Sequence, residues 1–179
     1  MAIFDRLNFR KGLTSQNPWA KYRVVYPDVQ RVAVATILAE SQVSFKIGKQ
    51  TIQAAGVIVE NAAYWYETDD LDEAQYLCAM LNSGVIDTRL ASLRSRLQAA
   101  HPHVHKKIFD VAPIPRFDPA DADHMALVLL TQVCAAKVQA WKVGGADGAT
   151  DIGVLRRKAR AVIAPELAQI DVHVQKILG

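Results

Sequence analysis

The sequence predicts an α+β protein. A small strand-rich N-terminal part with a mixed or antiparallel sheet is followed by a helical middle and a long C-terminal helix. Residues 21–67 hold short runs of β-branched and aromatic side chains separated by turn residues. From residue 68 onward, apolar residues recur at helical spacing. Hydrophobic residues make up 51% of the chain and charged residues 22%, which is typical of a folded protein.

The strand-rich part begins with the run Lys21-Tyr22-Arg23-Val24-Val25-Tyr26, which Pro27-Asp28 ends as a turn. Further strands are predicted at residues 31–38, 43–47, 51–53, 56–60 and 62–67. Because side chains alternate along a strand, either Trp65 or its two neighbouring tyrosines should be buried. We therefore expect at least one of these sets to belong to the core.

The helical part begins at Asp69 or Asp70, either of which can cap a helix over residues 71–81. Asn82-Ser83-Gly84 should stop it, and a second helix follows over 85–100. A short strand is predicted at 108–111, and Asp121 should open a helix that reaches about residue 141. The stretch 144–150 is glycine-rich and predicts a flexible linker, so the predicted units are 1–143, 144–150 and 151–179. The last helix should be kinked or divided at Pro165.

Composition narrows the possible classes of protein. The net charge is +3 and the pI about 8.9, which permits an anionic partner without requiring one. Neither a secretion signal nor an apolar run long enough for a membrane span is visible, so we expect a cytoplasmic protein with no membrane partner. Cys78 and Cys134 lie in apolar helical patterns and are expected to be free thiols rather than a disulfide or a zinc site.

A basic stretch runs from the second predicted helix into the segment that follows it, and Asp110 is its one acidic residue. Ammonium and guanidinium groups bind phosphates, and arginine can also read guanine edges in the major groove. The candidate DNA-binding residues are Arg89, Arg94, Arg96, His103, His105, Lys106, Lys107 and Arg116. The alternative is that the arginines form a solvated helix face.

Four segments occur in a characteristic order. They are Tyr64-Trp65-Tyr66-Glu67-Thr68-Asp69, residues 73–83 ending in Leu81-Asn82-Ser83, His103-Val104-His105-Lys106-Lys107, and Ile114-Pro115-Arg116-Phe117-Asp118-Pro119. In order and spacing they resemble the C-terminal target-recognition region of Taq-type N6-adenine DNA methyltransferases and of the fused restriction-modification enzymes related to them. The resemblance covers residues 62 to about 130, helped by the earlier strand at 19–26. The chain departs from it at His103-Val104-His105, where a single histidine is usual, and at Arg116, where lysine is commoner.

The resemblance implies a bacterial specificity domain that binds double-stranded DNA. Its expected partner is a methyltransferase or nuclease domain of the same system. The catalytic parts of that family are missing from the sequence: Asn17-Pro18 is followed by Trp19 rather than by Pro-Tyr, and the glycines form no nucleotide-binding fingerprint. We therefore expect no catalytic centre, no cofactor and no metal in this chain. S-adenosylmethionine is expected only in the parent or partner enzyme.

Other hypotheses remain open at this point. The alternating histidines from His101 to His105 could chelate a metal, although a basic loop is the simpler interpretation. The chain could instead be a protein-docking subunit of a larger enzyme, or a small hydrolase that uses the histidine-rich loop. The last helix is amphipathic, and its basic face at residues 156–160 is a secondary candidate for DNA backbone contact.

Overall fold

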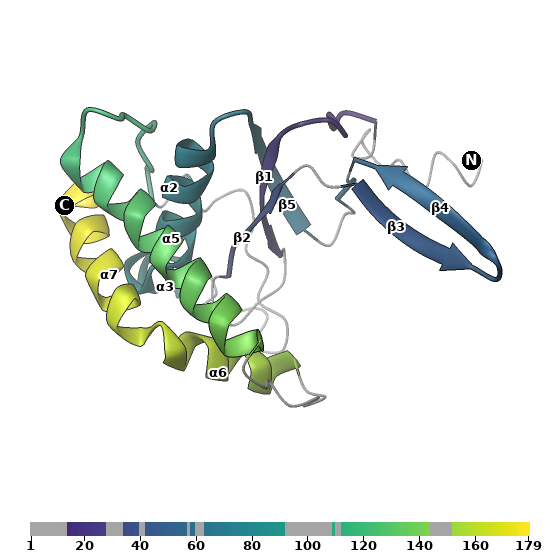
Figure 1. The fold of residues 1–179 in the computed structure, drawn as a ribbon. Coiled ribbons are helices and arrows are strands. Elements are labelled where there is room, and N and C mark those ends of the chain that lie inside the picture. The colour runs from purple at the N-terminus through teal and green to yellow at the C-terminus, as the bar shows by residue number, and fades with distance from the viewer. Residues whose placement is uncertain are drawn as a thin grey trace.

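The computed structural model describes residues 14–27, 34–39, 42–56, 58–59, 63–91, 109, 112–143 and 152–179. Within them, five strands precede the helices, as the sequence predicts for an α+β fold. A three-stranded sheet, a separate two-stranded hairpin and a group of packed helices are the parts of the molecule (Figure 1).

The three-stranded sheet is antiparallel and has the order β2-β1-β5. Its strands are β1 (Tyr22–Pro27), β2 (Thr36–Ala39) and β5 (Ala63–Thr68). Val24 in the middle of β1 is fully buried, because it lies between a strand on each side and a helix on one face. The tyrosine rings of Tyr26 and Tyr64 lie opposite each other across β1 and β5, 5.4 Å apart. The predicted core role of the aromatic run is therefore met in part by Tyr64, which packs against the core, while Tyr66 is 41% exposed.

The two-stranded hairpin consists of β3 (Gln42–Ile47) and β4 (Gln50–Ala55), which pair antiparallel. We call residues 42–55 the arm, because in Figure 1 they project from the sheet, away from the helices. The strand predicted at 51–53 lies within β4, whereas the described residues of the strand predicted at 56–60 are not in a strand: β4 ends at Ala55, and Gly56 follows it with a φ of 83°. That left-handed conformation suits glycine and ends the strand.

Helix α2 (Leu71–Asn82) is the central element of the fold. Asp70 is its N-cap: the side chain accepts hydrogen bonds from the backbone N–H groups of Asp72 and Glu73 at 2.9 and 3.3 Å. Residues 76–81 are all buried, because α2 packs against the sheet on one side and against other helices on the other. A helix that is buried on all sides has few polar positions, and the second half of α2 is accordingly apolar.

Four more helices follow α2: α3 (Gly84–Ala91), α5 (Ala122–Val143), α6 (Ile152–Val162) and α7 (Ala164–Leu178). Helices α3, α5 and α7 pack against α2, and α6 packs against α5. Helix α5 packs against both α2 and α7, and Leu127 of α5 is fully buried between them. The long C-terminal helix predicted for 151–178 is divided into α6 and α7, with Pro165 in the first turn of α7. Proline is tolerated there because the N–H it lacks would have no helical partner.

Phe109, the one described residue of the strand predicted at 108–111, has helical backbone, so that prediction is wrong at this position. The predicted linker at 144–150 lies outside the described residues. No helix of the described part is both long enough and apolar enough to span a membrane.

Candidate nucleic-acid interface

Of the eight residues predicted to bind DNA, six lie outside the described residues: Arg94, Arg96, His103, His105, Lys106 and Lys107. Arg89 is on α3, and its Nη2 donates to the carbonyl oxygens of Leu178 and Gly179 at 3.2 and 3.0 Å. The guanidinium therefore helps to join α3 to the end of α7, where helix carbonyls have no internal donor. DNA contact by Arg89 stays a prediction.

Arg116 is exposed beside a small aromatic pocket of about 130 Å³. Tyr66, Tyr76 and Phe117 contribute rings to its lining, and Glu73 contributes a carboxylate. Glu73 is held by hydrogen bonds from the hydroxyls of Tyr66 at 2.9 Å and Thr68 at 2.5 Å. Burial and the Glu73 carboxylate raise the pKa of Tyr66, so its hydroxyl keeps its proton at neutral pH. Arg116 is thus placed next to aromatic rings, a combination suited to nucleic acid.

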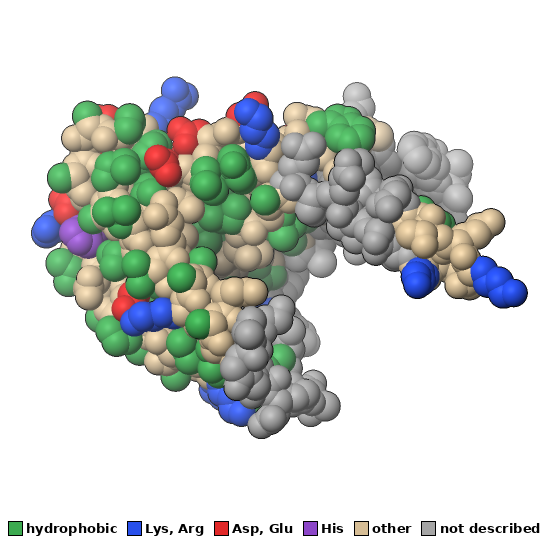
Figure 2. Space-filling model, in the orientation of Figure 1, with side chains coloured by type: hydrophobic (Ala, Val, Ile, Leu, Met, Phe, Trp, Pro, Cys, Tyr) green, Lys and Arg blue, Asp and Glu red, His purple; other side chains and the backbone are tan. Residues whose placement is uncertain are grey.

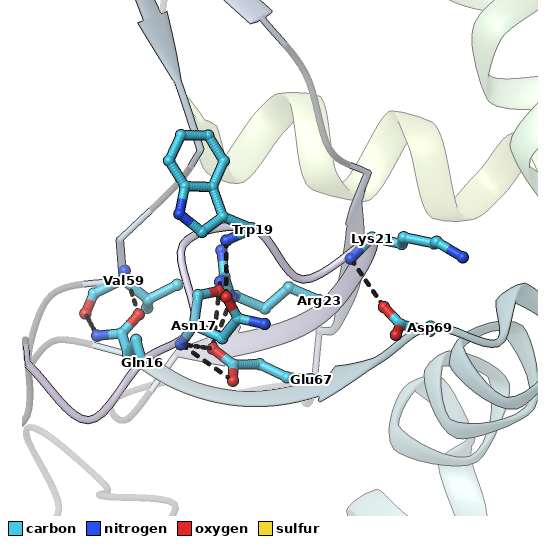
Figure 3. A network of polar contacts seen from close by, with 8 residues as sticks. All are labelled: Gln16, Asn17, Trp19, Lys21, Arg23, Val59, Glu67 and Asp69. Carbon is cyan, nitrogen blue, oxygen red and sulfur yellow. Dashed lines mark hydrogen bonds and ion pairs between the residues drawn. The ribbon is translucent and has the colours of Figure 1, made fainter.

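The sequence reasoning missed a buried polar network that anchors residues 14–20, which we call the anchoring turn (Figure 3). Arg23 of β1 and Glu67 of β5 form its centre, with Arg23 Nη2 and Glu67 Oε1 3.1 Å apart and the arginine side chain only 3% exposed. Arg23 also donates to the Asn17 carbonyl, and Asn17 N donates to both Glu67 carboxylate oxygens at 3.1 and 3.3 Å. Removing one member of such a buried pair costs about 3–5 kcal/mol.

The anchoring turn in turn holds the base of the arm. Gln16 makes two hydrogen bonds to the backbone of Val59: its Nε2 donates to the carbonyl at 2.6 Å, and its Oε1 accepts from the N–H at 2.7 Å. Gly56, directly after β4, lies so close to Pro18 that an added Cβ would be 2.6 Å from the Pro18 carbonyl oxygen. Trp19 in the same turn is 58% exposed. The described residues after the arm are therefore held by the anchoring turn, which also carries an exposed indole.

The end of the arm, residues 46–52, is exposed and basic. Lys46 and Lys49 are exposed, and residues 42–56 contain no acidic residue. In Figure 2 the arm's basic side chains, drawn in blue, lie along its lower edge and at its far end. The register pairs Lys46 with Thr51 on one face of the hairpin and Ile47 with Gln50 on the other. This hairpin could have been predicted from the sequence, because Lys46-Ile47-Gly48-Lys49 joins two β-rich runs through a glycine.

Helix α6 adds a second basic surface, as the sequence predicts. Arg156, Arg157 and Lys158 are exposed on it, and residues 152–162 contain no carboxylate. Basic groups on the arm and on α6 are therefore separate clusters on different elements. None of the eight residues predicted from the sequence to bind DNA belongs to the arm or to α6.

The described titratable groups form no nucleophile or metal centre of the usual kind. Burial raises the pKa of the Cys78 thiol to about 12, and burial also raises that of Cys134. Both thiols are therefore protonated at neutral pH. Within the described ranges, no group of three His, Cys, Asp or Glu side chains is arranged to hold a metal ion. The predicted histidine-rich loop lies outside those ranges.

Comparison of the chain with models of known protein families, with curated proteins and with solved structures gave no match. The functional interpretation therefore depends on the geometry of the described residues and on the sequence motifs.

Proposed function

We propose that this protein binds double-stranded DNA as the target-recognition module of a bacterial adenine methyltransferase or restriction-modification system. It performs no catalysis by itself and works with a methyltransferase or nuclease domain of the same cytoplasmic system. The proposal joins the motif resemblance of residues 62–130 to one structural observation, which is the projecting, basic, two-stranded arm.

The arm carries the proposal because its shape and chemistry match a groove of DNA. The major groove is about 12 Å wide and admits a two-stranded β-ribbon. Lys46 and Lys49 can contact phosphates, while Thr51, which shares a face of the hairpin with Lys46, supplies a hydroxyl that can hydrogen-bond to base edges. A hairpin with little packing against the rest of the chain gains little stability from its exposed side chains. Contact with a partner molecule explains why the side chains of the arm are exposed better than a role in stabilising the fold does.

The fixed base of the arm supports the same interpretation. Recognition loses less conformational entropy when the recognising element is already oriented. The Gln16–Val59 hydrogen bonds hold the segment that follows the arm, and the Arg23–Glu67 pair ties β1 to β5 beside it. Basic groups on α6 and at Arg116 are further candidates for backbone contact.

The test is binding of a fluorescent random-sequence duplex at a series of salt concentrations. Lys49→Ala should weaken binding and reduce the slope of log affinity against log salt by about one, because one phosphate contact is lost. Lys176→Ala removes an equal charge on α7, at the far end of the molecule from the arm, and should leave the slope unchanged (Figure 1). Equal effects of the two variants would refute a specific role of the arm, and no binding by the parent protein at low salt would refute the proposal.

The second candidate function is a protein-docking subunit without direct DNA contact. The observation that favours it is the apolar face of the same arm, where Ile47 and Ile52 are 59% and 37% exposed. A stable, salt-independent complex with a partner domain, lost in Ile47→Asp but kept in Lys49→Ala, would select this function.

A further inference from the structure

An apolar groove of about 390 Å³ lies between the sheet and the C-terminal helices. One wall is the β2 strand with the residues just before it, and the floor is formed by α2 and α5. The other wall is α6 and the start of α7. Most of its lining is apolar, including Ile37, Val138 and Leu167. A groove of this size and composition is large enough for side chains of another molecule.

The polar part of the lining is cationic. Arg156 and Arg160 both line the groove, since they are four residues apart and so share one face of α6. Among the described residues, no carboxylate forms a salt bridge with either guanidinium. The nearby Glu166 is outside the lining; its Oε1 forms a salt bridge with Lys137 Nζ at 2.6 Å, and its Oε2 is buried without a hydrogen-bond partner among the described residues. The groove thus offers two arginines and lacks an acidic side chain in its lining.

The strand wall of the groove is an edge of the sheet, since β2 pairs only with β1 in the described structure. Just before β2, the side chain of Asn82 bonds both backbone groups of Ala35: Oδ1 accepts from the N–H at 3.1 Å, and Nδ2 donates to the carbonyl at 2.9 Å. An amide side chain therefore pairs with the edge as a neighbouring strand would. Because peptide groups alternate along a strand, those of Ile37 and Ala39 face the same side as Ala35.

We propose that this groove binds an extended acidic segment of a partner protein, which adds a strand to the edge of β2. The segment's apolar side chains enter the groove, and its carboxylates pair with Arg156 and Arg160. Strand addition of this kind combines main-chain hydrogen bonds with pockets for alternate side chains. The charge of the groove favours an acidic partner over a second copy of this chain. A second copy docked through the same edge would bring its own Arg156 and Arg160 close to these two arginines, and like charges repel. The site is distinct from the arm and goes beyond the proposed DNA binding.

The test measures fluorescence anisotropy of a labelled peptide of about eight residues in which valine alternates with glutamate. The double variant R156E/R160E should weaken peptide binding by about tenfold or more. The matched control R157E/K158E makes the same change of charge on the same helix, at two exposed positions outside the groove lining, and should bind nearly as well as the parent. A peptide with lysine in place of glutamate should bind R156E/R160E better than it binds the parent protein.

A second pair of variants tests the groove without changing charge. Ala135 on α5 lines the groove and is exposed, so Ala135→Trp fills space without burying a misfit in the core. It should abolish peptide binding, whereas Ala136→Trp, the next exposed position but outside the lining, should not. N-methylation of alternate peptide nitrogens should also abolish binding, because it removes the donors for the β2 edge.

Three results would overturn the proposal. The first is equal weakening by R156E/R160E and R157E/K158E, which would show non-specific attraction. The second is unchanged binding in Ala135→Trp. The third is displacement of the peptide by duplex DNA together with loss of DNA binding in R156E/R160E alone, which would assign the groove to the nucleic-acid interface. Because the arm contributes no residue to the groove, loss of DNA binding in Lys49→Ala leaves this proposal standing.

Discussion

The helical body and the arm differ in what surrounds their apolar side chains. In the body, Leu81 and Leu127 are almost completely excluded from solvent between α2, α5 and the neighbouring helices. In the arm, Ile47 and Ile52 have the same chemistry but remain substantially exposed. Burial of a leucine or isoleucine side chain contributes about 1.5–3 kcal/mol, so the body gains stability from residues of a kind that the arm leaves in contact with water.

This difference separates residues that serve folding from residues available for binding. The arm is followed by Gly56, which lies against Pro18 of the anchoring turn, and its two strands pack mainly against each other. Its sequence is therefore little constrained by packing. An exposed, basic and partly apolar hairpin on a fixed base is consistent with an element that meets a partner.

The largest expected effect is on the body. Leu127→Ala should lower the free energy of unfolding by about 2–5 kcal/mol, because it leaves a cavity in a fully buried site. Ile47→Ala in the arm should change it by about 0.5 kcal/mol or less, since that side chain is 59% exposed. Urea denaturation followed by circular dichroism measures both. Similar losses of unfolding free energy in the two variants would mean that the arm packs on the body in solution, and the distinction between a buried body and an exposed arm would not hold.

A smaller effect is expected where the arm joins the body. Gly56→Ala adds a Cβ 2.6 Å from the Pro18 carbonyl oxygen at a φ of 83°, and it should cost about 1–3 kcal/mol or displace the arm. Gly48→Ala is the matched control, because its φ of 61° is also left-handed but the added Cβ meets open space. Limited proteolysis together with urea denaturation measures the difference. If Gly48→Ala is the more damaging substitution, contact with Pro18 does not hold the arm.

The smallest effect concerns acid pH and is confined to the body. Hydrogen bonds from His173 and then Lys176 lower the pKa of Asp123 below its ordinary value of 3.8, and these groups join α5 to α7. A lowered folded-state pKa contributes stability above pH 3.8, and that contribution is lost as the pH falls through the folded-state value.

Urea midpoints of the parent protein and Asp123→Asn should therefore differ at pH 6 and converge as the pH falls below 3.8. A difference that stays constant down to the lowest pH would exclude this carboxylate as the source. Salt should reduce the difference at pH 6, because the groups are partly exposed.

The element types were largely predictable from local sequence. The helix after Asp70 begins where an acidic cap and an apolar repeat predict it, and it ends at Asn82 beside a predicted stop. Pro165 marks the division of the C-terminal helices, because proline fits only the first turn. These features depend on neighbours within a few residues, which a single sequence contains in full.

The candidate interface was only partly predictable. Lys46 and Lys49 adjoin a glycine that indicates a turn, yet nothing local shows that this hairpin stands away from the body. Arg116 was expected to contact DNA, but two of the aromatic rings beside it, those of Tyr66 and Tyr76, come from β5 and α2, about fifty and forty residues earlier. Arg89 was selected for its charge, whereas its contact with Leu178 and Gly179 depends on a helix almost ninety residues away.

The sequence by itself determined the α+β class, the capped central helix, the divided tail and the basic character of the chain, because these follow from short-range periodicity and composition. The tertiary structure decided which apolar residues are buried, which hairpin projects, and which charges meet. Arg23 and Glu67 illustrate the reason: they are 44 residues apart in sequence but opposite each other across two strands. Contacts between residues so far apart in sequence depend on strand register and tertiary packing, and no local sequence pattern specifies either of them.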